Sequence, residues 1–383
     1  MDPGDLRESI PALEDATYLN TGASGPSPRP VVDAAVDVLR DHAYEAPGGE
    51  GTYAYGERVF DAARAALADH LGTRPGNVAL THSTGDGLAR IAAAVDWTPG
   101  DVVVRLDHEH AANVLPWARL ERLADVEVRV VETHGGRVDH DEFAAAVADA
   151  RLVAFSSICW TNGVRLDVPE LTEIAREAGA KVVVDAVQSV GQHAVDVTEW
   201  GADAVVASGH KWLLGDWGSG FVYVDPAFAD DLHPAVLGYF GVEYPPEADY
   251  DLKSGAQRFE VGTRSVAPYA ALTEAIATIE AVGLDAIEAQ IERLTDRLKA
   301  GVTTDTLHSP PPFESGLVAL DVDDPEATVQ RLAANDVHVK TVPGPDTGLV
   351  RVSLHAFNTT RDVDRLLSVL SSSRRESRRS RRA

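Results

Sequence analysis

Asp185 and Lys211 are the two residues whose types and spacing suggest chemistry. Asp185 ends the predicted strand Lys181–Asp185, and Lys211 follows the next predicted strand, DAVVAS, 26 positions further on. The carboxyl ends of parallel strands open onto one ligand crevice, so we expect both side chains to face one site. A lysine that forms a Schiff base, opposite a carboxylate that keeps a pyridine nitrogen protonated, is the chemistry of pyridoxal phosphate. Trp212 and Leu213 would partly desolvate Lys211, which lowers its pKa and makes it a nucleophile and base.

A second candidate is an anion site at the start of a predicted helix. In the segment LTHSTGDGLARI, Ser83, Thr84 and Gly85 open the helix, where free backbone amides and the helix dipole attract anions. Most Ser-Thr pairs at such a position are only helix caps. Because this segment occurs in the same chain as the lysine motif, we favour a site for the phosphate of the cofactor.

An alternating series of strands and helices must position these residues. The predicted strands are Val78–Thr81, Val102–Arg105, Val126–Val131, Leu152–Ser156, Lys181–Asp185, Ala204–Ala207 and Gly220–Val224. Helical segments lie between most of them, which predicts an α/β fold with a seven-stranded, mostly parallel sheet between two layers of helices. The last two strands are joined without a full helix, so one edge of the sheet is expected to be antiparallel.

The pattern changes after about residue 265. Two helical segments come first, and short strands and helices then follow: Ala267–Val282, Leu284–Ala300, Leu317–Val322, Pro325–Asn335, Val337–Thr341, Leu349–Leu354 and Thr360–Ser371. We predict an N-terminal segment near the active site (1–30), a large cofactor-binding domain (31–262), a small α+β domain (263–370) and a disordered basic tail (371–383). The six Arg of this tail could also form an arm for an anionic partner, but a solvated terminus fits the composition better.

The motifs together resemble a known family. The pattern Asp185-x-x-Gln188, followed by Ser208-Gly209-His210-Lys211-Trp212, resembles the fold-type I pyridoxal-phosphate enzymes. More narrowly, it is similar to the class V aminotransferases, which include cysteine desulfurases, kynureninases and isopenicillin-epimerase-like proteins. The resemblance extends from about Tyr18 to Leu370. It implies the fold-type I architecture, pyridoxal 5′-phosphate as cofactor, and a homodimer with shared active sites.

The resemblance also implies a role for each matching residue. Lys211 would be the Schiff-base lysine, Asp185 the partner of the pyridine nitrogen, and His110 the ring that stacks on the cofactor. Gln188 would donate to the phenolic oxygen of the cofactor. The phosphate would be held by Ser83, Thr84, Gly85, Ser208 and His210, and by Thr263 of the neighbouring subunit.

Three further positions match the substrate side of the family's site. Arg351, in LVRVSLHAFN, matches the guanidinium that grips the α-carboxylate of the substrate, a bidentate task that suits Arg. In the opening segment YLNTGASGP, Asn20 and the pair Gly22 and Ala23 would line the substrate side.

Two segments depart from the family pattern. Cysteine desulfurases carry a nucleophilic Cys on the loop before the Arg351 strand, but residues 338–347 contain none. Cys159, the only cysteine, is predicted to be a small buried hydrophobe, so persulfide chemistry is not expected. In SSICWTNGV, Trp160 stands where many relatives have a cofactor-contacting Asn, and Asn162 comes two places later. Either residue could contact the cofactor.

The core residues predict an enzyme that acts on a small amino acid but do not fix the reaction. Transamination, epimerisation and elimination of a β-substituent use the same lysine and carboxylate. The breadth of the family favours transamination, and a lyase or an epimerase is the alternative. A non-catalytic relative would be expected to lack Lys211, Asp185 or Arg351, and all three are present.

Composition limits the partners. The chain has 60 acidic and 34 basic residues and a net charge of −26, so it repels nucleic acid and anionic membranes. We predict a halophilic protein, because salt screens such self-repulsion. The sequence shows no signal peptide and no long apolar stretch, which predicts a cytoplasmic protein without a membrane partner. A single cysteine allows neither an internal disulfide nor a Cys-based zinc site, and no metal is predicted.

Overall fold

A seven-stranded sheet forms the centre of the larger part of the molecule. The computed structural model describes residues 1–243, 250–344 and 348–380. In spatial order the strands are β2 (Val78–Thr81), β8 (Gly220–Val224), β7 (Ala204–Ser208), β6 (Lys181–Asp185), β5 (Leu152–Ser156), β3 (Val102–Leu106) and β4 (Glu127–Val131). All seven predicted strands are confirmed. The antiparallel strand is β8, which pairs with β7 and β2, so it lies one place in from the edge and not on it.

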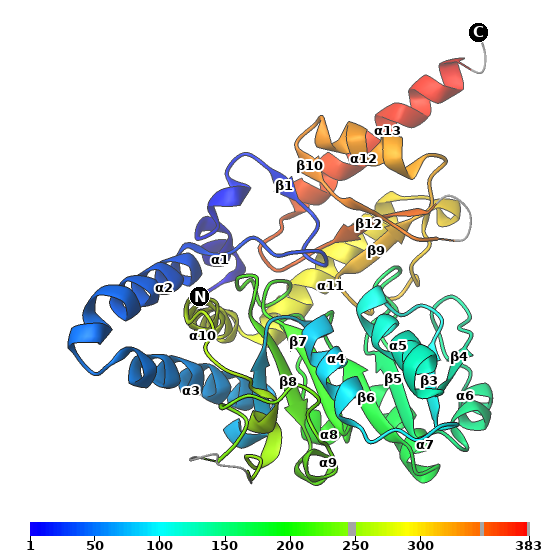
Figure 1. Ribbon diagram of the computed structural model, residues 1–383. Helices are drawn as coiled ribbons and strands as arrows, with labels where there is room; N and C mark the ends of the chain where they lie inside the picture. The colour runs from blue at the N-terminus through cyan, green and yellow to red at the C-terminus, as the bar shows by residue number, and fades with distance from the viewer. Residues whose placement is uncertain (244–249, 345–347, 381–383) are drawn as a thin grey trace.

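Helices cover both faces of this sheet (Figure 1). The first layer contains α3 (Thr52–His70), α6 (His140–Val147), α7 (Val168–Glu177), α8 (Val197–Trp200) and α10 (Ala267–Val282), and the second contains α4 (Thr84–Ala94), α5 (Leu115–Ala124) and α9 (Pro226–Asp230). Strand β6 shows why its sequence is apolar throughout. Val182 and Val184 belong to the core of the first layer, whereas Val183 belongs to that of the second. Each such burial contributes about 1.5–3 kcal/mol.

A second, smaller sheet lies above the first. Its strands, in the order β11 (Lys340–Val342), β12 (Leu349–Ser353) and β9 (Leu317–Leu320), are antiparallel. The sheet packs on α11 (Leu284–Gly301), α12 (Pro325–Ala333) and α13 (Thr360–Ser380). The predicted run Val337–Thr341 forms two strands, because β10 (Val337–His338) pairs with the N-terminal β1 (Thr17–Tyr18) instead. The N-terminal segment is thereby attached to the C-terminal part of the chain.

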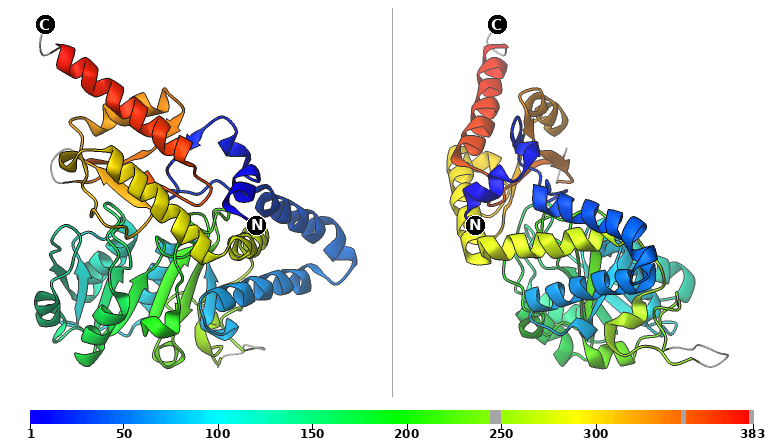
Figure 2. Two further views of the ribbon diagram at one scale, coloured as in Figure 1. Left: turned by 180° about the vertical axis from the view of Figure 1, so that it is seen from behind. Right: turned by 90° about the vertical axis from the view of Figure 1, so that its left-hand side faces the viewer.

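Two features lie at the margins of the molecule. Helix α13 continues through Ser380, so the backbone after Ser371 is helical where composition predicted a disordered tail. Arg, which is frequent there, is a good helix former, and residues 381–383 lie outside the described part. At the other end, α1 (Pro3–Glu8) precedes α2 (Arg29–Arg40), and α2 and α3 extend together to one side (Figure 2). Among the described residues no helix has the length and apolar character needed to cross a membrane.

Candidate active site

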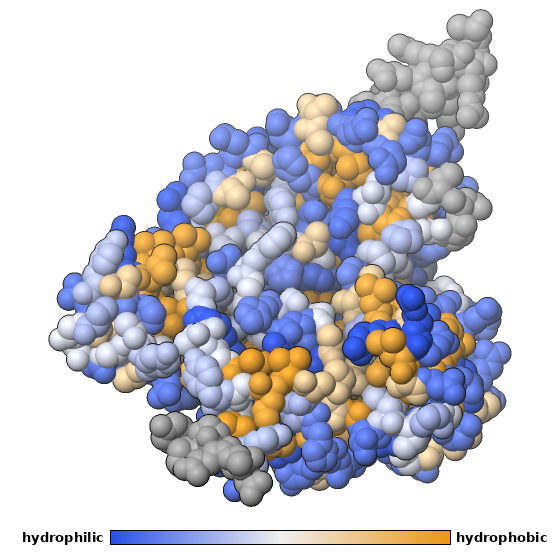
Figure 3. Space-filling view, in the orientation of Figure 1, coloured by the Kyte–Doolittle hydropathy of each residue, from blue (hydrophilic) through white to orange (hydrophobic). Residues whose placement is uncertain are grey.

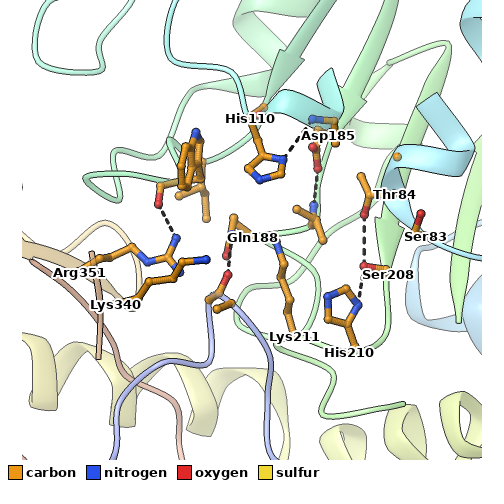
Figure 4. A pocket seen from close by; sticks show the side chains of 18 residues that line it. Ser83, Thr84, His110, Asp185, Gln188, Ser208, His210, Lys211, Lys340 and Arg351 are labelled. Carbon is orange, nitrogen blue, oxygen red and sulfur yellow. Dashed lines mark hydrogen bonds between the residues drawn. The ribbon is translucent and has the colours of Figure 1, made fainter. Parts of the chain in front are cut away.

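A cavity of about 350 Å³ opens at the carboxyl edge of the large sheet. Most of the residues that the sequence predicts for the site line it (Figure 4): Ala23, Ser83, Thr84, Gly85, His110, Asp185, Gln188, Ser208, His210, Lys211 and Arg351. These side chains come from segments spread over more than 300 positions of the chain. The structure therefore brings the predicted catalytic, phosphate-binding and carboxylate-binding groups together.

The strand ends explain why these residues converge. Strands β5, β6 and β7 are parallel neighbours that end at Ser156, Asp185 and Ser208, and Ser156 lies directly beside Asp185 in the register. Helix α4 begins at Thr84 on the same edge, immediately after β2. Polar side chains can therefore point into the cavity without interrupting the apolar core below them.

Lys211 and Asp185 form the centre of the cavity. Asp185 is buried, and one of its oxygens accepts a hydrogen bond from the backbone amide of Val187 at 3.0 Å. Burial raises the pKa of Asp185 to about 6, against the opposing charge of Lys211. Burial likewise lowers the pKa of Lys211 to about 8, although Asp185 counteracts part of this effect. The Lys211 amine makes no hydrogen bond or ion pair with another described residue, and it lines the cavity, where a ligand can reach it.

One end of the cavity is suited to an anion. Ser83 caps α4, so the amides of Thr84 and Gly85 in the first turn have no acceptor inside the helix. The Thr84 hydroxyl donates to Ser208 Oγ at 3.2 Å, and Ser208 Oγ lies 3.1 Å from Nδ1 of His210. Burial and the nearby Lys211 lower the pKa of His210 to about 4, so its ring is neutral at pH 7.

Gln188 joins the N-terminal segment to the cavity floor. Its amide nitrogen donates to the carbonyl of Gly22 at 3.1 Å, and its oxygen accepts from the indole of Trp212 at 2.7 Å. A side-chain amide has two N–H groups, so one donor of Gln188 remains for a ligand. Both predicted neighbours, Gly22 and Ala23, line the cavity.

His110 and Trp160 form an aromatic wall. Their rings meet edge to face, with centroids 5.0 Å apart. The backbone amide of Ala112 donates to Nδ1 of His110, which fixes the orientation of the imidazole. Of the two residues left open as cofactor contacts, Trp160 lines the cavity, whereas the Asn162 side chain bonds to the backbone of Gly135 and Val164.

The opposite end of the cavity carries two cations. Arg351 is only 2% exposed, and its guanidinium donates to the carbonyl of Trp160 at 2.8 Å. Its Nε has no hydrogen-bond partner in the described part of the chain, and burial lowers the pKa of Arg351 to about 10. Lys340 lies beside it and also lines the cavity. Lys340 is not among the residues predicted for the site, although it lies in the predicted strand Val337–Thr341.

A buried carboxyl group behind the cavity was also missed. Glu109 accepts hydrogen bonds from the backbone amide of Ser156 at 2.8 Å, from the Ser156 hydroxyl at 2.5 Å and from the Asn113 amide at 2.8 Å. Burial raises the pKa of Glu109 to about 7. Glu109 ties the segment that carries His110 to the end of β5. Its position between two histidines in HEHAAN gave no sign of burial.

Two predicted residues do not line this cavity. Thr263 is exposed in a separate hollow, where its backbone amide donates to the hydroxyl of Tyr239 at 3.1 Å. Asn20 lies deeper, in a bridge with Ser353, and its Oδ1 is buried without a partner among the described residues. Cys159, the single thiol, is also buried outside the cavity, and burial raises its pKa.

Comparisons with known proteins agree with this arrangement. The sequence profile of the family described as aminotransferase class V matches residues 17–366. A probable cysteine desulfurase of Methanothermobacter thermautotrophicus is 31% identical over 385 residues, which cover 94% of this chain and 96% of the relative. A probable cysteine desulfurase of Pyrococcus abyssi is 29% identical, with coverage of 96% of both chains.

The fold matches a solved structure over almost the entire chain. The apo structure of a cysteine desulfurase from Thermococcus onnurineus NA1 superimposes with a TM-score of 0.90 at 27% identity. The match covers 97% of this chain and 98% of that chain. The seven-stranded sheet, the smaller sheet and their connections therefore follow an arrangement already seen in a related protein.

Proposed function

Because the chain belongs to the class V aminotransferase family, we propose that it binds pyridoxal 5′-phosphate in this cavity and acts at Cα of an amino acid. The single observation that carries the proposal is that Lys211 and Asp185 line one cavity, between an anion site and a guanidinium. When bound, the cofactor supplies a ring that accepts electrons from the bonds broken at Cα.

The cavity fits this cofactor at each of its polar groups. The start of α4, with Ser208 and His210, offers amide, hydroxyl and imidazole donors for a phosphate. Asp185 would hold the proton on the pyridine nitrogen, and the free N–H of Gln188 would donate to the phenolic oxygen. His110 would stack on the ring.

The remaining residues act on the amino acid itself. Arg351 would bind its α-carboxylate through two parallel hydrogen bonds, for which the planar guanidinium is suited. Lys211 would hold the cofactor through its amine, and the same amine would be placed to remove the proton from Cα of the substrate. Its lowered pKa keeps part of the amine neutral at physiological pH.

We place the reaction closer to a lyase than to an aminotransferase. Sequence alone favours transamination, but the relatives reported above are named cysteine desulfurases, enzymes that act at a β-substituent. The family's loop thiol is absent from residues 338–347, and Cys159 does not line the cavity. A leaving group at Cβ would therefore depart into solution and not onto a protein thiol.

A panel of amino acids tests the type of reaction. We expect the holoenzyme to convert a substrate with a leaving group at Cβ, such as L-cystine, into pyruvate and ammonia, with release of the thiol-derived fragment. Products are measured by coupled lactate dehydrogenase and by ammonia assay. A keto acid formed without ammonia would support transamination, and a racemised amino acid would support epimerisation. Either result would overturn the lyase proposal but leave the cofactor proposal intact.

We further propose that the active unit is a homodimer. Val32, Val36 and Leu39 form an apolar stripe on α2 that is between 37% and 54% exposed, and Figure 3 shows apolar side chains gathered over this helix. Exposed stripes of this kind commonly mark protein interfaces. Thr263 is also exposed, next to the apolar Tyr239, as a residue that serves a neighbouring subunit would be.

Mixed dimers test whether Thr263 acts in the neighbouring site. Lys211→Ala and Thr263→Asp variants should each be inactive alone, the second because its carboxylate repels the phosphate. After unfolding and refolding together, about a quarter of the wild-type activity should return, because half of the dimers are mixed and each has one intact site. No recovery in a sample that sedimentation shows to be dimeric would mean that Thr263 does not act across the interface.

A further inference from the structure

Lys340 is a cation that lines the cavity, but the reaction proposed above assigns it no role. The chain has five lysines, and two of them, Lys211 and Lys340, line the same cavity. Elsewhere, Lys181 pairs with Asp203, and Lys299 donates to the carbonyl of Pro312. The ammonium of Lys340 makes no hydrogen bond or ion pair with any described residue, in a chain that has 60 acidic residues.

The small sheet fixes where Lys340 points. Lys340 on β11 and Arg351 on β12 are direct partners in the antiparallel register. Side chains of directly opposed residues project from the same face, so the ammonium and the guanidinium enter the cavity side by side. Figure 4 shows both at one end, across from Ser208 and His210 at the other. Burial is the main cause that lowers the pKa of both His110 and Lys211, and the positive charge of Lys340 adds to each of these shifts.

Lys340 is the one cation of the described cavity lining to which the proposed reaction assigns no anionic group. Among the described residues that line the cavity, Asp185 is the only acidic one, and the cofactor nitrogen would use it. The phosphate would use the start of α4, and the α-carboxylate would use Arg351. Lys340 then remains at the substrate end, with no negative group assigned to it.

We propose that the substrate is an amino acid whose side chain ends in a carboxylate, and that Lys340 binds this second carboxylate. The inference rests on the proposed function, since it assigns Arg351 to the α-carboxylate. Lys340 is exposed and flexible, so it acts as a mobile point charge that can follow the side chain. Arg351, buried and held by the Trp160 carbonyl, sets the position of Cα.

Binding of isosteric amino acids to the holoenzyme tests the proposal. Titration of the visible cofactor absorption gives dissociation constants for L-aspartate against L-asparagine and for L-glutamate against L-glutamine. We expect at least one acid to bind about ten to a hundred times more tightly than its amide, as for a hydrogen bond to a charged group in a partly desolvated site. Lys340→Met should remove this preference and leave the amides unchanged. Lys299→Met, outside the cavity lining, is the matched control and should behave as wild type.

Reversing the charge at position 340 should create a new ligand preference. Lys340→Glu should disfavour both acids and favour L-lysine over the isosteric but neutral L-norleucine. Equal binding of acids and amides by the wild type would overturn the proposal. An equal loss for acids, amides and L-alanine in Lys340→Met would also overturn it, because Lys340 would then serve the α-carboxylate. A wild-type protein that fails to bind the cofactor would refute the proposed function itself, a different result from cofactor binding without acid preference.

Discussion

Lys211→Ala should lose the visible absorption of the bound cofactor and lower turnover by about a thousandfold or more. The substitution removes both the covalent attachment and the group that moves the Cα proton, and positioned acid–base groups alone contribute about 10²–10⁴ in rate. The visible absorption of the Schiff base reports cofactor attachment, and turnover is followed with the best substrate of the panel. The Lys340→Met variant is the matched control, because it removes another lysine of the same cavity and should keep the absorption.

The pH dependence of cofactor capture tests the same residue without substitution. The neutral amine is the nucleophile, and the pKa of Lys211 is lowered to about 8. The rate at which the apoprotein gains the visible absorption should therefore rise up to about pH 8 and then level off. A lysine with its ordinary pKa would give a rate that still rises above pH 9 or so. A covalent attachment that survives in Lys211→Ala would refute the central assignment.

The part of the fold that sequence predicts is the part with a simple physical signature. Strand β6 reads KVVVD because helices cover both of its faces, and a short, continuous apolar run is typical of such strands. Most strands of the large sheet share this signature, whereas the edge strand β4 contains Glu127 and Arg129 and is mostly not buried. A change of strand direction has a weaker sequence signature. The missing helix between β7 and β8 predicts that one strand is antiparallel. The place of β8 within the sheet depends on its pairing with β2, which local sequence does not encode.

The residues of the candidate site also divide into those that local sequence predicts and those that it does not. Asp185, Ser208 and Lys211 follow strands that the sequence predicts, so the rule that strand ends converge is enough to bring them together. Lys340 could not be found by that rule, because it enters the cavity from the smaller sheet. Its position depends on the pairing of β11 with β12 and on how that sheet sits above the cavity.

Burial is the property that sequence conveys least. Glu109 lies in a segment with charged and polar neighbours, yet it is 7% exposed and bonded on all sides. Thr263 shows the converse limit. It is exposed in the single chain, and its predicted role requires a second copy of the protein. Neither the burial of Glu109 nor an interface at Thr263 has a periodicity that a single sequence could display.

Asp185 is expected to lower the stability of the apoprotein, although the holoenzyme needs this residue for catalysis. Burial raises its pKa from 3.8 to about 6, so the folded state holds a proton more tightly than the unfolded state does. A group of this kind contributes most to stability below pH 4, and the contribution is lost as the pH rises through about 6. In the apoprotein at pH 8, Asp185→Asn should therefore raise the free energy of unfolding, by at most about 3 kcal/mol. The gain should shrink to less than about 1 kcal/mol near pH 4, where Asp185 is protonated in the folded state and partly protonated in the unfolded state.

In the holoenzyme the same substitution should be harmful, because it should lower turnover. Asp185→Asn keeps the size of the side chain and an oxygen that can accept from the Val187 amide, so Lys211 should still capture the cofactor. Without the carboxylate the pyridine nitrogen loses its proton, and turnover should fall by about 10²–10⁴ while the visible absorption persists. Circular-dichroism melts of the apoprotein at pH 8 and pH 4, with turnover of the holoenzyme, separate the two effects. A variant that is less stable at pH 8 and fully active would show that Asp185 is a structural residue, because only a carboxylate kept for the cofactor is costly when the cofactor is absent.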